Sequence, residues 1–416
     1  MKNLTLLLII CLLTACNPSN RNSYGNSLKV IDVEDAFRHP EAFTLADLGK
    51  EQSYIPLETT DSSIVAISSI TAMVVTDRHI LIGARTAPIK VFDKTTGHYI
   101  GQIGQIGNGP AEYPNGTNFT TDPITRKVYV RISPSKQQCY DITGHFLKTV
   151  EWKEAAGGMI IAPYFLDDKI YTYVNIPTEQ TNNLSYLYDA DSGAIQDSLP
   201  LRWGGDIPAG KSKLVMPLAG AEMLGGMAYI VQFEDNRWTY GSQNNAAYWY
   251  HDGELCMKDF FCDTLFTVKG FDRLTPRMVF KMGSSGGFAR YENSDVMEDK
   301  YIITRLMETE NIIYFNLFKD MYNVDGWMKG GSNPPYCGIY DKRSGRTKVM
   351  KSVRIESDRE EMPGFAIYNI STAGELIVCY QTEDLINARE KMPESEQPAW
   401  LKQLKEDDNP VILLIK

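Results

Sequence analysis

The sequence predicts an all-β protein, and more specifically a six-bladed β-propeller built from four-stranded antiparallel blades. A phrase made of an aromatic residue, an aspartate and a glycine-containing turn recurs along the 416 residues. The first copies of this phrase are 48 residues apart, a spacing typical of propeller blades. Strand-like segments near both ends of the chain supply one last, shared blade, which would leave no free sheet edges.

The recurring phrase is interpreted as a hairpin turn near the end of a blade. Aspartate accepts hydrogen bonds from the backbone of the turn, and glycine adopts the positive φ that the turn requires. The aromatic ring packs on the sheet just before the turn. The copies are Phe92–Gly97, Tyr140–Gly144, Tyr188–Gly193, Tyr250–Gly253 and Tyr340–Gly345.

Three segments depart from the regular spacing. The interval from Tyr188 to Tyr250 is 62 residues, so this blade carries an insertion at Arg202–Gly226. The interval from Tyr250 to Tyr340 is 90 residues, which we interpret as the end of one blade and one full blade enlarged by loops. The two loops are Gly283–Asp299 and Lys319–Pro335.

The last blade takes its strands from both ends of the chain. We expect its fourth strand at Ser53–Glu58, and two short helices interrupt its C-terminal part. Trp400 lies on the apolar face of the second helix, which favours packing on the blade. A membrane-surface helix is the alternative, which the acidic end of the segment disfavours. The expected C-terminal strands are Gly364–Ile370, Glu375–Gln381 and Val411–Lys416, and the helices are Glu383–Lys391 and Pro398–Lys405.

The glycine-rich loop Gly104–Gly109 looks like a phosphate-binding loop in isolation. A phosphate-binding loop leads into a helix whose N-terminus faces the anion. Here Pro110 and a strand follow the glycines. The sequence therefore predicts a turn between two blades.

The first 16 residues have the properties of a secretion signal. Lys2 supplies the positive end, and the apolar run Leu4–Leu13 is too short to span a bilayer as a helix. Leu13–Cys16 matches the bacterial lipobox, so the segment resembles lipoprotein signal peptides. This resemblance implies cleavage before Cys16 and acylation of that cysteine, which anchors the protein to the membrane. An ordinary secretory signal is the alternative.

Residues 17–28 are polar and rich in turn residues, and we expect a flexible tether there. Residues 29–416 would then form a single propeller domain. Asn17 is not an acidic residue of the kind that retains lipoproteins in the inner membrane, and no acidic run follows it. We therefore expect an outer-membrane lipoprotein that faces the periplasm.

Composition and spacing bear on several classes of site. The net charge of −10, the pI near 5.2 and the lack of a basic cluster disfavour nucleic-acid binding. Cys256 and Cys262 could form a disulfide in an oxidising compartment, and the sequence leaves this open. The histidines and cysteines show no metal-ligand spacing, so we predict no metal site and no cofactor. A calcium ion at the propeller axis, as in propeller enzymes that hydrolyse lactones, is the alternative.

Particular phrases resemble known families. Gly101–Val150 is similar to an NHL repeat, with its glycine-rich loop, proline, Val-Tyr-Val strand and aromatic-Asp turn. Most of the chain resembles a group of uncharacterised six-bladed propeller lipoproteins of Gram-negative gut-type bacteria, which more often have glycine where Ala111 stands. That resemblance implies a propeller and a lipid anchor, and it transfers no catalytic residues. The matching phrases are Tyr54–Thr60, Gly107–Tyr113, Cys262–Val268 and Asp407–Val411.

Candidate ligand-binding residues lie in or beside the three irregular segments. Loops on a rigid scaffold commonly carry binding sites. Exposed aromatic rings can stack on sugars or anchor a protein partner, and arginines can contact an anionic group. The alternative is that the rings only cover the enlarged blades. The candidates are Trp203, Arg237, Trp238, Tyr240, Arg290, Tyr291 and Trp327.

The sequence thus favours a non-catalytic envelope protein that binds a glycan, a peptide or another envelope protein. The alternative is an envelope enzyme on the same scaffold, either a calcium-dependent hydrolase such as a lactonase or a polysaccharide lyase. No Ser/His/Asp set can be recognised from the sequence.

Overall fold

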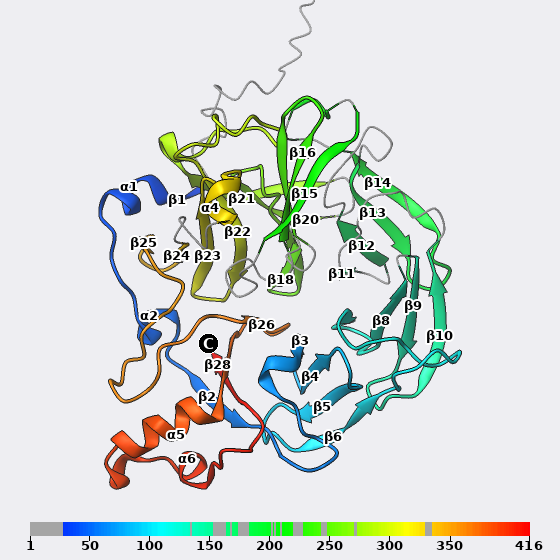
Figure 1. Ribbon diagram of the computed structural model, residues 1–416, viewed down its shortest axis with the longest axis vertical. Helices are drawn as coiled ribbons and strands as arrows, with labels where there is room; N and C mark the ends of the chain where they lie inside the picture. The colour runs from blue at the N-terminus through cyan, green and yellow to red at the C-terminus, as the bar shows by residue number, and fades with distance from the viewer. Residues whose placement is uncertain are drawn as a thin grey trace, which may run out of the picture.

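The computed structural model shows an all-β protein with few helices (Figure 1). It describes residues 28–133, 135–152, 164–166, 169–173, 183–200, 203, 205–208, 210–218, 228–242, 248–269, 273–328 and 335–416. The predicted signal, Cys16 and nearly all of the predicted tether lie outside these residues. The described residues form seven sheets, which follow one another around the middle of the molecule.

The first three sheets follow the regular repeat, and each has four antiparallel strands. In the second sheet, Asp141 Oδ1 accepts hydrogen bonds from the backbone N–H groups of Thr143 (2.9 Å) and His145 (3.0 Å), and Gly144 has a φ of 90°. The predicted turn chemistry is therefore present. Sheet 1 contains β3 (Ile70–Val75), β4 (His79–Ala84), β5 (Ile89–Asp93) and β6 (Tyr99–Ile103); sheet 2 contains β7 (Phe119–Thr121), β8 (Val128–Ser133), β9 (Lys136–Tyr140) and β10 (Phe146–Glu151); sheet 3 contains β11 (Tyr164–Leu166), β12 (Lys169–Tyr173), β13 (Asn183–Asp189) and β14 (Ile195–Pro200).

The next three sheets are less regular. Sheet 4 has three strands, and a strand from the N-terminal region joins sheet 5 in parallel. Sheet 4 contains β15 (Ser212–Leu218), β16 (Ala228–Phe233) and β17 (Trp238–Ser242); sheet 5 contains β18 (Tyr248–His251), β19 (Glu254–Met257), β20 (Thr264–Val268), β21 (Leu274–Lys281) and β1 (Lys29–Asp32); sheet 6 contains β22 (Tyr301–Glu308), β23 (Ile312–Lys319), β24 (Tyr336–Asp341) and β25 (Thr347–Met350).

Both ends of the described chain contribute to sheet 7, as the sequence predicted. Its order is β2-β28-β27-β26, and the N-terminal strand β2 pairs with β28. The two predicted helices are also present between β27 and β28. Sheet 7 contains β2 (Gln52–Pro56), β26 (Asn369–Ile370), β27 (Leu376–Tyr380) and β28 (Val411–Ile415), and the helices are α5 (Thr382–Lys391) and α6 (Ala399–Gln403).

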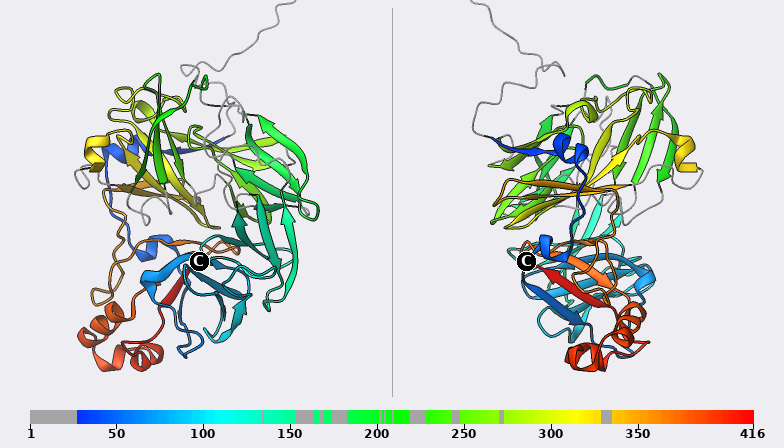
Figure 2. Two further views of the ribbon diagram at one scale, coloured as in Figure 1. Left: turned by 45° about the vertical axis from the view of Figure 1, so that its right-hand side comes forward. Right: turned by 90° about the vertical axis from the view of Figure 1, so that its left-hand side faces the viewer.

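Residues 29–48, here called the N-terminal strap, connect sheets 5, 6 and 7. The strap starts at β1, continues through α1 (Val33–Arg38) against β25, and ends with α2 (Leu45–Leu48) before β2. Figure 2 shows it along the side of the molecule. Ile31 and Val33 pack in one apolar cluster with Phe280 and Val349, and Phe43 lies in a second cluster. The sequence did not reveal this arrangement.

The seven sheets exceed the six predicted blades by one, so the blade count is not confirmed. The difference comes from Tyr250–Gly253, which forms a turn as expected, but between the first two strands of sheet 5. The other copies of the phrase lie between third and fourth strands. The predicted insertion Arg202–Gly226 contains β15 and belongs to a separate sheet.

Sheet 4 lies farther from the middle of the molecule than its neighbours (Figure 1). The Tyr250 hydroxyl on β18 accepts a hydrogen bond from the N–H of Phe165 (2.6 Å) and donates to the carbonyl of Phe165 (3.0 Å) on β11. Sheets 3 and 5 therefore meet directly near the centre. Sheet 4 does not separate them there, although it lies between them in the chain.

Candidate functional site

The three irregular segments meet in space and form one unit, here called the accessory module. It comprises the described residues of the first segment, from Trp203 onward, with sheet 4, the loop Gly283–Asp299, and residues 319–328 of the third segment with α4 (Val324–Met328). Ile207 of the first segment packs in one apolar cluster with Tyr291 of the loop. Trp238 and Glu292 exchange two backbone hydrogen bonds of 2.8 and 3.0 Å, so the loop extends the outer edge of β17. The ring of Trp238 also stacks on Tyr322, with centroids 6.2 Å apart.

Two predicted ligand-binding residues of this region, Trp203 and Trp327, are half-buried. Trp203 stacks on Phe266 with ring centroids 5.4 Å apart. Trp327 stacks on Phe318 at 4.7 Å, and its Nε1–H donates to the carbonyl of Met321 at 2.9 Å. Each ring is thus held by a partner on one face while it keeps some contact with solvent.

Four other predicted residues lie in the interior. Trp238 is 6% exposed, Tyr291 is 3% exposed, and Tyr240 and Arg290 are fully buried. Tyr240 meets the ring of Phe260 edge-on at 5.1 Å, and burial raises the pKa of Tyr291 to about 12. In this structure these side chains hold the accessory module together and do not offer a binding surface.

The two predicted arginines differ in their surroundings. Arg290 makes an ion pair of 2.5 Å with the equally buried Asp259, and its guanidinium lies 4.7 Å from the ring centre of Phe261. This pair attaches the loop to the turn between β19 and β20. Arg237 is 26% exposed, and it binds Asp235 (2.8 Å) and the carbonyl of Asp206 (2.8 Å). Arg237 is therefore the predicted arginine that an outside ligand can reach.

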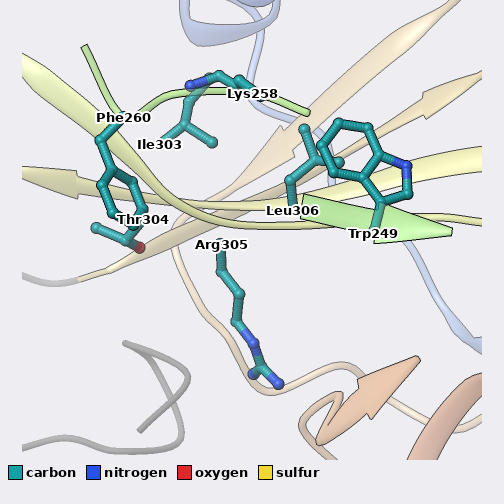
Figure 3. A pocket seen from close by; sticks show the side chains of 7 residues that line it. All are labelled: Trp249, Lys258, Phe260, Ile303, Thr304, Arg305 and Leu306. Carbon is teal, nitrogen blue, oxygen red and sulfur yellow. The ribbon is translucent and has the colours of Figure 1, made fainter. Parts of the chain in front are cut away.

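A small cavity lies between sheets 5 and 6, next to the module (Figure 3). Phe260, which packs against Tyr240 of sheet 4, forms part of its wall. Its volume is about 20 Å³, which is room for roughly one water molecule. It cannot hold a sugar or a peptide side chain. The lining residues are Trp249, Lys258, Phe260, Ile303, Thr304, Arg305 and Leu306.

A charged network that the sequence did not reveal lies at the end of β22. Glu308 is fully buried, and its carboxylate binds both terminal nitrogens of Arg277 at 2.8 Å. Lys342 Nζ lies 2.7 Å from the same carboxylate, Trp249 Nε1–H donates to it at 2.8 Å, and His251 Nε2 is 3.4 Å away.

The surroundings of this network determine its charge. Burial by itself would raise the pKa of Glu308, but Arg277 and Lys342 outweigh burial and lower the pKa to about 2. Burial lowers the pKa of His251 despite the nearby carboxylate, so His251 is neutral at pH 7. The network is thus cationic around one central carboxylate. Its members are spread over positions 249 to 342, so no local sequence motif could have predicted the network.

Three further features concern possible metal ligands, the Cys256–Cys262 disulfide and membrane-spanning helices. Within the described ranges, no group of three or more His, Cys, Asp or Glu side chains could hold a metal ion. Cys256 and Cys262 are both free thiols. None of the helices that the structure describes combines the length and apolarity that crossing a bilayer would require.

Comparison with known proteins places the chain in a family. Residues 28–416 match the model of DUF4934, a domain of unknown function, and the chain belongs to this family. No curated protein matches the sequence. The match agrees with the predicted resemblance to uncharacterised bacterial relatives.

Two solved structures match most of this chain. A Bacteroides fragilis protein named as exported is 14% identical, with a TM-score of 0.57 over 94% of this chain and 99% of that one. A Bacteroides vulgatus member of the DUF4221 family is 11% identical, with a TM-score of 0.49 over 88% of this chain and 97% of that one. At such identities, the first of these likenesses supports the fold alone.

Proposed function

We propose that this protein is a lipid-anchored envelope protein that binds a ligand or a protein partner without catalysing a reaction, and that it binds through the accessory module. One observation supports this most. The three segments that break the regular repeat converge on one another, although they are far apart in the chain. Departures from a regular scaffold that gather in one place are typical of a binding region.

Three predicted residues remain reachable from solvent in the module. Trp203 and Trp327 are half-buried rings backed by other rings, and Arg237 is partly exposed. Preformed rings lose little entropy on binding a sugar face or an apolar side chain. A neighbouring guanidinium favours a ligand with an anionic group. An anionic glycan or an acidic peptide is therefore the class of ligand that we propose.

Six sheets would form the propeller in this proposal, and sheet 4 would be an addition outside it. Inner strands of successive sheets are in contact, β3 with β7, β18 with β22, and β22 with β26. The hydrogen bonds between Tyr250 and Phe165 connect sheets 3 and 5 without sheet 4. These contacts support a scaffold of six blades that presents one attached module.

The envelope location rests on the lipobox at Leu13–Cys16. The similar Bacteroides fragilis protein is named as exported, which agrees with this location. Cys16→Ala should move the protein from the membrane fraction to the soluble fraction, because the acyl chains are its proposed anchor. Unchanged fractionation of this variant would contradict the anchor.

Binding is tested with the protein that lacks residues 1–16, on a glycan array and in pull-downs from envelope extracts. Once a ligand is found, Trp327→Ala and Arg237→Ala should each weaken its binding about tenfold or more, as expected for hot-spot residues. Trp400→Ala is the matched control, because Trp400 is also half-buried and stacks on Tyr54 at 5.0 Å, but far from the module.

Two results would overturn the proposal. One is binding that falls as much in Trp400→Ala as in the module variants. The other is calcium-dependent turnover of a lactone or a polysaccharide, which would favour the enzyme alternative.

A further inference from the structure

The cavity between sheets 5 and 6 has a mixed lining, in which apolar side chains stand beside a hydroxyl group and basic residues. It lies along β22, with Trp249 and Leu306 on one side and Phe260 and Thr304 on the other (Figure 3). The Glu308 network begins beside it, because Trp249 both lines the cavity and donates to Glu308. A cavity in such surroundings favours a polar occupant over an empty, apolar void.

The hydroxyl group of Thr304 is an unsatisfied donor at this cavity. Thr304 is fully buried, and its Oγ1 has no hydrogen-bond partner among the residues that the structure describes. A buried hydroxyl group without a partner is costly. An occupant that accepts a hydrogen bond from Thr304 would remove this cost.

Lys258 is a buried cation beside the same cavity. It is 5% exposed, and its Nζ donates one hydrogen bond of 3.0 Å, to the carbonyl of Asp259. Its ammonium group also lies 5.8 Å from the ring centre of Phe280. Within the described part of the chain, no carboxylate forms an ion pair with it. An ammonium group has three donors, so a buried one with a single acceptor is incompletely compensated.

Positive charge dominates the surroundings of the cavity. Arg305 lines it, is 7% exposed and donates to the carbonyl of Ile367 at 2.9 Å. The chain as a whole carries a net charge of −10, so the sign of this interior region is opposite to that of the protein. The basic side chains of the region are Lys258, Arg277, Arg290, Arg305 and Lys342, and the acidic ones are the fully buried Asp259 and Glu308 and the half-buried Asp263 beside Lys258.

We propose that this cavity binds a small monovalent anion of about the size of chloride. The Thr304 hydroxyl group would donate to the anion, and the charge of Lys258 would hold it electrostatically. The volume of about 20 Å³ excludes phosphate, a carboxylate ligand and a sugar. The bound anion would stabilise the contact of sheets 5 and 6 below the accessory module, independently of any ligand of the module.

The direct test uses crystals of the protein lacking residues 1–16, grown or soaked in sodium bromide. An anomalous peak in the cavity beside Thr304 is expected. The parallel test measures thermal unfolding in chloride and in gluconate at equal ionic strength. Chloride should raise the Tm by roughly 1–2 °C at a tenfold excess over its Kd.

Two variants make the test specific. Thr304→Val should abolish the bromide peak and the chloride-dependent rise in Tm. Thr347→Val should retain both, because the Thr347 hydroxyl is also buried without a described partner but lies on β25, away from the cavity. The proposal is overturned by a cavity that contains only water in bromide crystals. It is also overturned by a chloride effect on Tm that persists unchanged in Thr304→Val.

Discussion

The same turn phrase has different surroundings in the regular sheets and in sheet 6. A Cβ atom added to Gly97, Gly144 or Gly193 would lie within 2.0–2.2 Å of a backbone carbonyl in the outer strand of the preceding sheet. For Gly345 the nearest described atom is the Tyr340 hydroxyl, 4.0 Å away. All four glycines have a positive φ of 66–90°. The phrase therefore encodes the turn, whereas the neighbouring sheet determines how closely the turn is packed.

The two regions also differ in their buried charge. Among the described residues, Asp122 is the buried charged side chain of sheets 1 to 3, and it accepts hydrogen bonds within a turn. Sheets 5 and 6 and the loop between them contain the other buried charged residues. They are Lys258, Asp259, Arg290, Arg305 and Glu308. The regular region thus depends on apolar packing and turn chemistry, while the irregular region depends on ion pairs between sheets.

The largest effect is expected from removing the central charge of the irregular region. Glu308→Gln leaves Arg277 and Lys342 without their carboxylate, and it should lower the free energy of unfolding by about 3–5 kcal/mol. Urea denaturation measures this loss. Glu310→Gln, on the exposed turn nearby, is the control and should change stability by less than about 0.5 kcal/mol. Equal losses in both variants would contradict the importance of the network.

Low pH should weaken the Glu308 network, because it protonates the central carboxylate. The pKa of Glu308 is about 2 in the folded protein, against about 4.3 in an unfolded chain. Its stabilising contribution is complete above pH ~4.3 and is lost as the pH falls towards 2, by about 3 kcal/mol in all. Unfolding measured from pH 5 to pH 2 should therefore show a steeper loss of stability for the wild type than for Glu308→Gln. Parallel curves would disprove this contribution.

The turn comparison can be tested with two alanine substitutions. Gly345→Ala should cost about 1 kcal/mol, because only the positive φ is unfavourable for alanine. Gly144→Ala should cost about 3 kcal/mol, because its Cβ would also lie 2.2 Å from the carbonyl oxygen of Gln102. The difference between the two losses in thermal or urea unfolding isolates the contact with the preceding sheet. Equal losses would mean that this contact can relax without cost.

A smaller effect is expected at the surface of the accessory module. Arg237→Ala removes a partly exposed ion pair with Asp235, so the free energy of unfolding should fall by less than about 1 kcal/mol. Its ligand binding should nevertheless fall, as proposed above. A variant that is strongly destabilised would show that Arg237 has a structural role like that of Arg290.

The smallest difference between the two regions is expected in the reactivity of their buried thiols. Alkylation of these thiols in the native protein should be slow in both regions. Burial raises the pKa of Cys139 in sheet 2, and it raises the pKa of Cys256 and Cys337 to about 12. At pH 8 the native protein should therefore show almost no alkylation at these cysteines by mass spectrometry, and full alkylation after unfolding. Rapid reaction of Cys256 alone would indicate that the interface of sheets 5 and 6 opens.

The sequence by itself determined the features that depend on neighbouring residues. The strands of sheets 1 to 3, the turns at Asp141 and its counterparts, and the helices α5 and α6 follow from short-range periodicity and turn chemistry. The shared sheet 7 was also predictable, since an incomplete set of strands at one end needs a partner from the other. The sequence also located the three irregular segments, from their departure from the 48-residue spacing, but it did not predict that they meet.

Only the tertiary structure decided which strands and charges come together over long separations. The residues Tyr250–Gly253 can form a turn between the first two strands of a sheet or between the last two. The strands that pair on either side place this turn between the first two strands of sheet 5. The parallel pairing of β1 with β21 joins residues about 250 positions apart, and the ion pair of Glu308 with Arg277 joins two different sheets. Such contacts depend on the packing of whole sheets, and neither hydrophobic period nor turn residues encode them. For the same reason, the burial of Trp238, Tyr240 and Arg290 became clear only in the folded molecule.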